Sequence, residues 1–186
     1  MVREPGAVVI ETPRLRLRNW RPEDAEVFER HVNTPAVMRW LGGVKDPDFL
    51  HWVVRERFTG WQAERGFTFW ALERKEDGEL LGFCGLKLGD DPGSPVEGEI
   101  EIGWRLREDA WGQGYAKESA IASLDFAFET LGAERVVALT VEGNRESWGL
   151  MRRLGMTRRP DLDYEGPDWA DDRVIVYMIE RAEWRA

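Results

Sequence analysis

The spacing of hydrophobic residues changes sharply along the chain, and one change marks the segment around which the rest is organised. Acidic or small residues alternate with apolar ones at Glu99, Ile100, Glu101, Ile102, Gly103 and Trp104. A period of two residues with one apolar face predicts a β-strand. Apolar residues then recur every three or four positions from Tyr115 to Leu131, and Gly132 follows where helices commonly stop. Residues 97–127 are therefore predicted to form a strand, a tight turn and a long amphipathic helix.

The same reasoning predicts the other elements. Strands are expected at residues 11–20, 67–74, 80–88, 135–141, 156–164 and 173–180, in addition to the central strand. Helices are expected to begin near Pro22, Val37, Pro47 and Asn144. The resulting order, β-α-α-β-β-β-α-β-α-β-β, describes an α/β sheet protein with mixed strand pairing. Because no internal repeat or long linker interrupts the chain, residues 1–186 are expected to form a single domain.

The amino-acid composition limits the kinds of partner and the cellular compartment that we expect for this protein. The formal net charge of −9 argues against direct binding of nucleic acid, which relies on clustered Lys and Arg, and is compatible with a cationic or amine substrate. An acidic surface also serves solubility alone. The single cysteine, Cys84, excludes an internal disulfide, and two histidines without a Cys–His cluster make a zinc site improbable. With no signal-peptide core and no apolar run of membrane-spanning length, we expect a cytoplasmic protein without a membrane partner.

The turn between the central strand and the long helix has the chemistry of an anion site. Its sequence is Trp111, Gly112, Gln113, Gly114, Tyr115 and Ala116. The first N–H groups of a helix lack intrahelical partners, and glycines let a phosphate approach the backbone closely. The alternative is an ordinary tight strand-to-helix connection. The turn is neither a Gly-x-Gly-x-x-Gly motif, because Lys117 replaces the third glycine, nor a P-loop, because no Gly-Lys-Ser/Thr follows.

This turn resembles the acyl-CoA loop of the GNAT acetyltransferase superfamily. The form Trp-Gly-x-Gly-Tyr-Ala is typical of its ribosomal-protein N-acetyltransferase (RimJ/RimL-like) branch, and the opening Thr-x-Arg-Leu-x-Leu-Arg at residues 12–18 is similar to the start of that branch. The resemblance covers nearly the whole chain. It implies acetyl-CoA as co-substrate and a mixed, mostly antiparallel sheet of about seven strands, flanked by helices and splayed between the fourth and fifth strands. By analogy, a homodimer is a candidate assembly.

The resemblance also assigns cofactor contacts. It implies that backbone groups of Ile102, Trp104 and Leu106 pair with the pantetheine amides, and that N–H groups of residues 112–116 hold the pyrophosphate. A second cofactor segment is implied at Asn144 and Ser147. Asn144 is equally suited to capping the following helix, which needs no chemistry.

The expected acid and base come from two short segments. Many family members carry a tyrosine as general acid where this chain has Met151, which cannot donate a proton. In the branch that the chain resembles, a serine at the Ser147 position is implied as the donor to the thiolate, directly or through water. A carboxylate near the acceptor suits the base, and Glu101 is the first choice and Glu99 the second. The alternatives are a solvated acidic strand face and simple attraction of a cationic substrate.

The sequence thus predicts an acetyl-CoA-dependent N-acetyltransferase. It would move the acetyl group by direct transfer in a ternary complex to a primary amine, either of a small molecule or of a protein N-terminus. Cys84 lies in an apolar run and is not expected to take part. Two other classes stay open: a non-catalytic acyl-CoA sensor or scaffold on the same fold, which the missing tyrosine supports, and an unrelated nucleotide-binding α/β protein.

Overall fold

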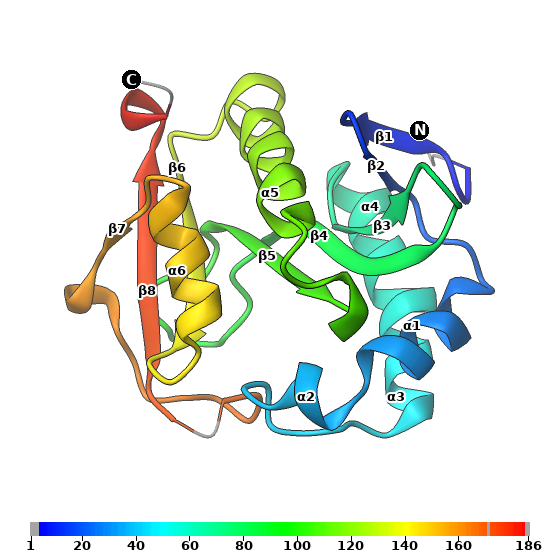
Figure 1. The fold of residues 1–186 in the computed structure, drawn as a ribbon. Helices are drawn as coiled ribbons and strands as arrows, with labels where there is room; N and C mark the ends of the chain where they lie inside the picture. The colour runs from blue at the N-terminus through cyan, green and yellow to red at the C-terminus, as the bar shows by residue number, and fades with distance from the viewer. Residues whose placement is uncertain (1–3, 171, 185–186) are drawn as a thin grey trace.

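The computed structural model describes residues 4–170 and 172–184, and its strands form one eight-stranded sheet (Figure 1). The strands are β1 (Val8–Glu11), β2 (Leu15–Arg18), β3 (Phe69–Arg74), β4 (Leu80–Leu88), β5 (Ile100–Leu106), β6 (Arg135–Val141), β7 (Thr157–Arg158) and β8 (Val174–Glu180). Their order across the sheet is β1-β2-β3-β4-β5-β6-β8-β7. Each neighbouring pair is antiparallel except β5 and β6, which are parallel. The expected mixed, mostly antiparallel sheet is confirmed, with one strand more than the seven expected.

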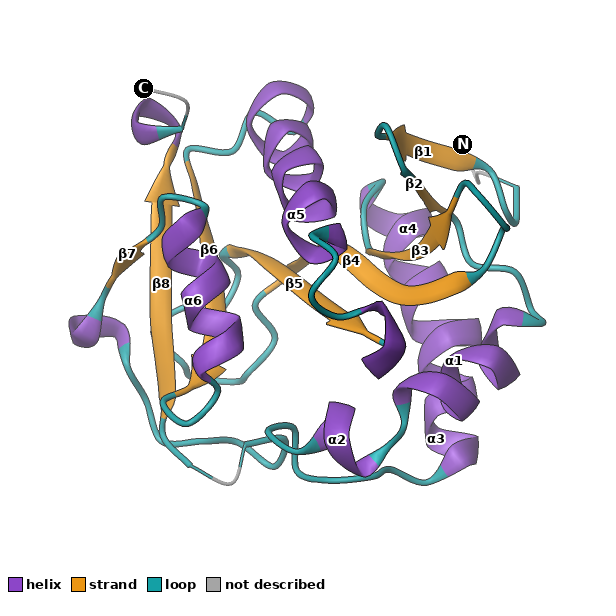
Figure 2. Ribbon diagram, in the orientation of Figure 1, coloured by secondary structure: helices purple, strands orange, loops and turns teal. Residues whose placement is uncertain are grey.

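Helices cover both faces of this sheet (Figure 2). The α-helices are α1 (Asp24–Val32), α2 (Pro35–Met38), α3 (Pro47–Trp52), α4 (Thr59–Arg65), α5 (Tyr115–Asp125) and α6 (Arg145–Arg153). A π-helical turn, Val53–Phe58, joins α3 to α4, and a second one, Phe126–Thr130, extends α5. α5 and α6 pack on the face that carries Trp70, Cys84 and Ile102. α1 and the first π-turn pack on the opposite face, over Phe69 and Phe83, and α3 packs against α1.

Two expected strands differ from the structure, and proline is involved in both. Residues 11–20 were expected to form one strand, but β1 and β2 instead form a hairpin whose turn contains Pro13, and Thr12 N–H donates to the Leu15 carbonyl over 3.0 Å. The expected strand at residues 156–164 is only the two-residue β7, because Pro160 begins a 3₁₀ turn. Proline has no N–H to donate, so it interrupts a ladder of strand hydrogen bonds.

The sheet separates into two parts between β5 and β6. The two strands share one register pair, Glu101 with Val137, although each is seven residues long. Each strand is instead fully paired on its outer side, β5 with β4 and β6 with β8. The expected splay between these strands is therefore confirmed. Trp40, just after α2, bridges toward the β6 side, where its ring lies against Gly143.

Arg18 is the exception to the alternation that predicts β2. It occupies a polar position of that pattern, yet it is only 2% exposed. Its guanidinium donates to Asp24 over 2.7 and 3.0 Å and to Glu73 over 2.6 Å. Asp24 lies at the start of α1 and Glu73 on β3, so this buried network joins the first helix to the sheet.

Replacing Arg18 with Met should lower the free energy of unfolding by about 3 kcal/mol, because two buried carboxylates lose a shared cation. Arg16→Met is the matched control: Arg16 also donates to Glu73, over 3.1 Å, but its side chain is 37% exposed, and the expected loss is below about 1 kcal/mol. Urea denaturation of both variants measures the difference. Equal losses would show that the buried network is not what ties α1 to the sheet.

Candidate active site

The Gly-x-Gly turn forms an open cradle at the start of α5. Gly112 and Gly114 have φ of +71° and +81°, in the left-handed region that favours glycine. A side chain at Gly112 would meet no atom within 4 Å, so the cradle is open to solvent there. In the part of the chain that the structure describes, the N–H groups of residues 112–116 donate to no protein acceptor. Free N–H groups at a helix N-terminus can hold a phosphate group.

Side chains of the turn itself keep the cradle in place. The Trp111 indole N–H donates to the Leu106 carbonyl over 2.9 Å, and the Gln113 amide donates to the Asp109 carbonyl over 3.0 Å. Tyr115 is buried in the core, and Ala116 packs against that core. The turn is therefore fixed by its side chains, while its backbone N–H groups stay available.

Arg14 is a residue of this site that the sequence analysis missed. It lies in the β1–β2 turn, and its guanidinium donates to the Gln113 carbonyl over 2.9 Å and to Glu118 over 2.7 Å. The same group lies 4.5 Å from the centre of the Tyr115 ring. The tertiary fold places this cation beside the cradle, and no local sequence motif predicts its position. Its positive charge would favour an anion there.

Ile102, Trp104 and Leu106 of β5 offer the splay only their backbone groups. Ile102 and Leu106 are buried in the core beneath α5, and Trp104 packs against the same core. These side chains are therefore unavailable to a ligand. Beyond the pair Glu101–Val137, the backbone groups on the β6 side of β5 have no strand partner, so they are free to bond an extended, amide-bearing chain.

Glu101 is a buried carboxylate at the point where β5 and β6 diverge. It is 8% exposed, and Lys87 Nζ lies 3.4 Å from Oε2. This distance makes an ion pair, yet Oε2 accepts no hydrogen bond in the described part of the chain. Burial raises the pKa of Glu101 to about 7, Lys87 opposes the shift, and Asp90 and Asp91 add to it. A carboxyl group that titrates near neutral pH suits a general base.

Glu101 lies beside a wider polar network that includes Lys87, Asp90, Asp91 and Tyr164. The sequence pattern did not predict this network. Lys87 also pairs with Asp90, which divides its charge between two carboxylates. Asp91 accepts hydrogen bonds from the Tyr164 hydroxyl and, over 3.1 Å, from the Trp169 indole. Burial and Asp91 raise the pKa of the Tyr164 hydroxyl far above its usual range. This tyrosine is therefore a poor proton donor.

Glu99 has a different environment. Arg135 binds its carboxylate with two hydrogen bonds of 2.5 and 3.0 Å. It precedes β5, at the end of that strand remote from the Gly-x-Gly turn, and it lines a shallow cavity of about 370 Å³ with Gly98 and Glu134. Arg135 therefore pairs with the Glu99 carboxylate, whereas the cation beside Glu101 is Lys87.

The segment at the start of α6 is a helix cap. The Asn144 side-chain oxygen accepts from the Ser147 N–H over 3.4 Å, which confirms the capping role. Ser147 is half-buried on the first turn. Met151 is 1% exposed and belongs to the core between α6 and the sheet. A tyrosine at that position would need a different packing.

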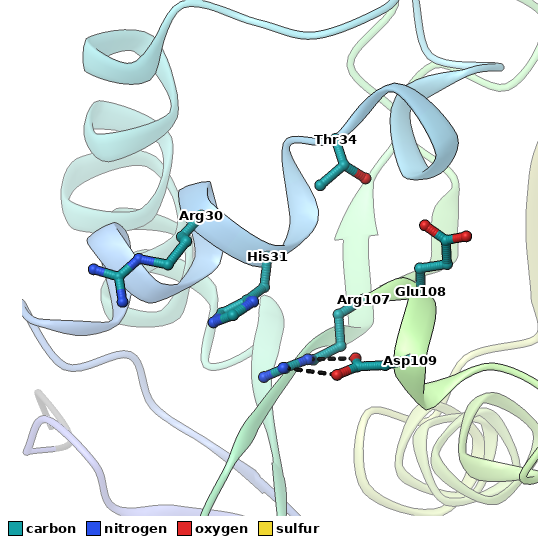
Figure 3. A pocket seen from close by; sticks show the side chains of 6 residues that line it. All are labelled: Arg30, His31, Thr34, Arg107, Glu108 and Asp109. Atoms are coloured by element: carbon teal, nitrogen blue, oxygen red, sulfur yellow. Dashed lines mark hydrogen bonds and ion pairs between the residues drawn. The ribbon is translucent and has the colours of Figure 1, made fainter.

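A pocket of about 450 Å³ opens between α1 and the end of β5 (Figure 3). It is lined by Arg30, His31, Thr34, Arg107, Glu108 and Asp109. The Arg107 guanidinium donates to both oxygens of Asp109, over 2.6 and 2.8 Å, so its charge is already matched. The pocket lies on the α1 side of the sheet. Three of its lining residues, Arg107, Glu108 and Asp109, come shortly before the Gly-x-Gly turn in sequence.

Other chemistry is sparse in residues 4–170 and 172–184. The Cys84 thiol is fully buried, and burial raises its pKa to about 11, so it is a poor nucleophile at neutral pH. His, Cys, Asp and Glu side chains gather in no group of three or more that could hold a metal ion. None of the described helices has the length and apolar character to span a bilayer.

Comparison with known proteins identifies the class. A model of the acetyltransferase (GNAT) domain matches residues 14–157. The uncharacterized protein YkkB of Bacillus subtilis is 33% identical over 150 residues, 78% of this chain and 83% of that protein. The crystal structure of an acetyltransferase from Agrobacterium tumefaciens is similar with a TM-score of 0.76 and 29% identity, and it covers 96% of this chain and 99% of its own. The chain therefore belongs to the GNAT acetyltransferase family, and it is an acyltransferase.

A further relative carries the cofactor in its name. The FsC-acetyl coenzyme A-N(2)-transacetylase of Aspergillus fumigatus is 32% identical over 114 residues, which are 58% of this chain and 48% of that protein. This match covers 58% of the chain, whereas the match to YkkB covers 78%.

The free energy of unfolding of Glu101→Gln, relative to that of the wild type, should increase as the pH rises. The folded protein holds its proton at Glu101 up to about pH 7, whereas the unfolded chain releases it near 4.5. Wild-type stability should therefore fall as pH rises between these values, and a neutral glutamine escapes this loss. We expect a gain of roughly 2 kcal/mol at pH 8 compared with pH 5, measured by urea denaturation. A difference between variant and wild type that does not change with pH would contradict the raised pKa of Glu101.

Proposed function

We propose that this acyltransferase moves an acetyl group from acetyl-CoA to a primary amine, of a small molecule or of a protein N-terminus, by direct transfer in a ternary complex. The observation that carries this proposal is Glu101, a buried carboxylate with a pKa near 7 at the point where the sheet opens. On one side of it lies the free backbone of β5, which leads to the Gly-x-Gly cradle.

Acetyl-CoA fits the groups that the site offers. The free N–H groups of residues 112–116 suit the pyrophosphate, with the Arg14 guanidinium beside them. The unpaired backbone at Ile102, Trp104 and Leu106 suits the amides of the pantetheine arm. Asn144 and Ser147 begin α6 on the other side of the splay and complete the proposed set.

Each chemical step has a candidate group. An amine is protonated at neutral pH, so it must lose a proton before it attacks the thioester carbonyl, and Glu101 takes this proton directly or through a water molecule. A backbone N–H group polarises the carbonyl oxygen. As the C–S bond breaks, the sulfur leaves as a thiolate that Ser147 stabilises by a hydrogen bond, directly or through water. Glu99 stays the second choice as base, since Arg135 already engages its carboxylate.

The acceptor class follows from the branch. We place the chain in the RimJ/RimL-like branch because its turn reads Trp-Gly-x-Gly-Tyr-Ala at residues 111–116. This placement supports an exposed amine such as a protein N-terminus. The net charge of −9 favours approach of a cationic acceptor, and the single buried cysteine suits the reducing cytoplasm.

A non-catalytic acyl-CoA sensor is the second candidate, and Met151 is the observation in its favour. Its buried thioether stands where many relatives have the acid, and it can donate no proton. A sensor would bind acetyl-CoA and acetylate no amine.

Gly112→Trp should abolish acetyl-CoA binding, because an indole would fill the open cradle. Gly78→Trp is the matched control: Gly78 has a similar φ of +74°, also has no atom within 4 Å of an added Cβ, and lies in the β3–β4 turn. Both variants carry the same backbone strain, so only loss of binding distinguishes them. Calorimetric titration with acetyl-CoA, with ATP and NAD as comparison ligands, measures the effect. Retained affinity in Gly112→Trp, or preference for ATP or NAD in the wild type, would refute the cradle assignment.

Glu101→Gln should lower kcat by about a hundredfold, the usual contribution of a general base, and leave acetyl-CoA affinity unchanged. In the wild type, kcat/KM should rise with pH through about 7, as the carboxyl group loses its proton. Free-thiol detection with a panel of amines and N-terminal peptides measures turnover. Glu99→Gln should change kcat by less than about threefold. A wild-type protein that binds acetyl-CoA and turns over no amine would support the sensor instead.

A further inference from the structure

Arg105 is the feature of this molecule that its fold leaves unexplained. It lies on β5 and, by the alternation of the strand, on the same face as Glu101. Phe83, its direct partner on β4, places its ring 5.2 Å from the Arg105 guanidinium carbon. One side of the cation is therefore covered by an aromatic ring on the face of the sheet that α1 covers.

No carboxylate neutralises this cation. In the described part of the chain Arg105 takes part in no hydrogen bond and no ion pair, and its Nε atom is buried without an acceptor. Burial alone lowers the pKa of the guanidinium to about 10, so the group is still charged at neutral pH. Arg107, two residues further on, is bound by Asp109 and Glu79. Arg105 as a whole is partly buried, and its two terminal nitrogens, unlike Nε, are not buried. A partly buried charge that no carboxylate balances is unusual as a purely structural feature, and here the open end of the guanidinium is accessible to a ligand.

The position of Arg105 relates it to the acceptor. Arg105 lies four residue steps along the strand from Glu101, which is about 13 Å between Cα atoms. Gly103 lies between them on the same face and has no side chain; the Phe69 ring fills the space above it, 2.8 Å from where a Cβ would stand. The Glu101 carboxylate, the buried Phe69 ring and the unpaired Arg105 guanidinium therefore follow one another along this face.

We infer that the acceptor carries an anionic group, a carboxylate or a phosphate, roughly 10 Å from its reacting amine, and that Arg105 binds this group. The inference rests on the proposed function, because it takes Glu101 as the place of the amine. A guanidinium presents several N–H donors in one plane and matches both anions in geometry and charge. The phosphates of acetyl-CoA belong, in the proposed function, at residues 112–116, beyond the end of β5.

Paired acceptors test this inference. An extended tripeptide is about 10 Å long, so tripeptides with a free C-terminal carboxylate are compared with their C-terminal amides. A second pair compares aminoalkyl phosphates with aminoalkyl alcohols of the same length, and distinguishes phosphate from carboxylate recognition. Wild type should prefer the anionic member of one pair by ten- to a hundredfold in kcat/KM, as expected for a charge-assisted contact. Arg105→Met should bring this ratio close to one, and Arg105→Lys should keep part of it.

Arg107→Met is the matched control, because it removes a neighbouring guanidinium that already has partners, and it should keep the preference. The same ligand pairs are also titrated into the CoA-bound protein, so that binding is measured without turnover. Turnover without any charge preference would overturn the role of Arg105 and leave the proposed function intact. Anion binding that depends on Arg105 without turnover would overturn amine transfer and leave the anion site.

The thermal midpoint separates a ligand contact from a structural role. Arg105→Met removes an unpaired, partly buried charge, so the free protein should melt at the wild-type temperature or above it. A fall of several degrees would show that the guanidinium holds the fold, and a preference lost together with stability would count against the inference. Equal acetyl-CoA affinity in wild type and Arg105→Met is also expected; a weaker affinity would assign Arg105 to the phosphates of CoA instead.

Discussion

The divergence of β5 and β6 is the constraint on which the candidate site depends. The two strands run parallel and share a single register pair, so most of their facing backbone groups have no strand partner. Such a gap is tolerated because each strand keeps seven register pairs with its outer neighbour, β4 or β8. α5 crosses between them and covers one face, as parallel neighbours require a long connection. The sheet therefore leaves a row of unused donors and acceptors in an otherwise well-paired structure, and these groups begin at Glu101.

Buried and partly buried charges are paired differently in the structural network around Arg18 and in the candidate site on β5. Arg18 is as buried as a core residue, but Asp24 and Glu73 bind all sides of its guanidinium. On β5 the pattern is reversed, because Glu101 shares its one cation, Lys87, with Asp90, and Arg105 has no carboxylate. Packing forces explain the first arrangement, since a shared network stabilises α1 on the sheet. They do not explain the second, and incomplete pairing of this kind is common where a ligand completes the set.

Local patterns predicted most of the fold, and register and tertiary contacts account for what they missed. The period-two alternation placed β5, and the glycines with positive φ placed the turn before α5. Alternation could not distinguish the buried Arg18 from the exposed Arg16, because both occupy polar positions in the same strand. Lys87 faces Glu101 only through the register of β4 and β5, whose long irregular connection leaves that register undetermined in sequence. Arg14 comes from the β1–β2 turn, 99 residues before Gln113, and no spacing rule predicts so long-range a contact.

The environment of Glu101 shows how incomplete pairing keeps the pKa of a buried carboxyl group near neutral. A lysine at 3.4 Å would ordinarily stabilise the carboxylate and lower its pKa. Here Lys87 also binds Asp90, and Asp90 and Asp91 oppose ionisation of Glu101, so burial outweighs the attraction and the pKa stays near 7. If Lys87 served Glu101 alone, the carboxylate would be stable and a weak base at neutral pH. If Lys87 were absent, the buried group would keep its proton. The shared lysine holds the pKa of Glu101 between these limits, which is what the proposed role of Glu101 as base for an amine requires.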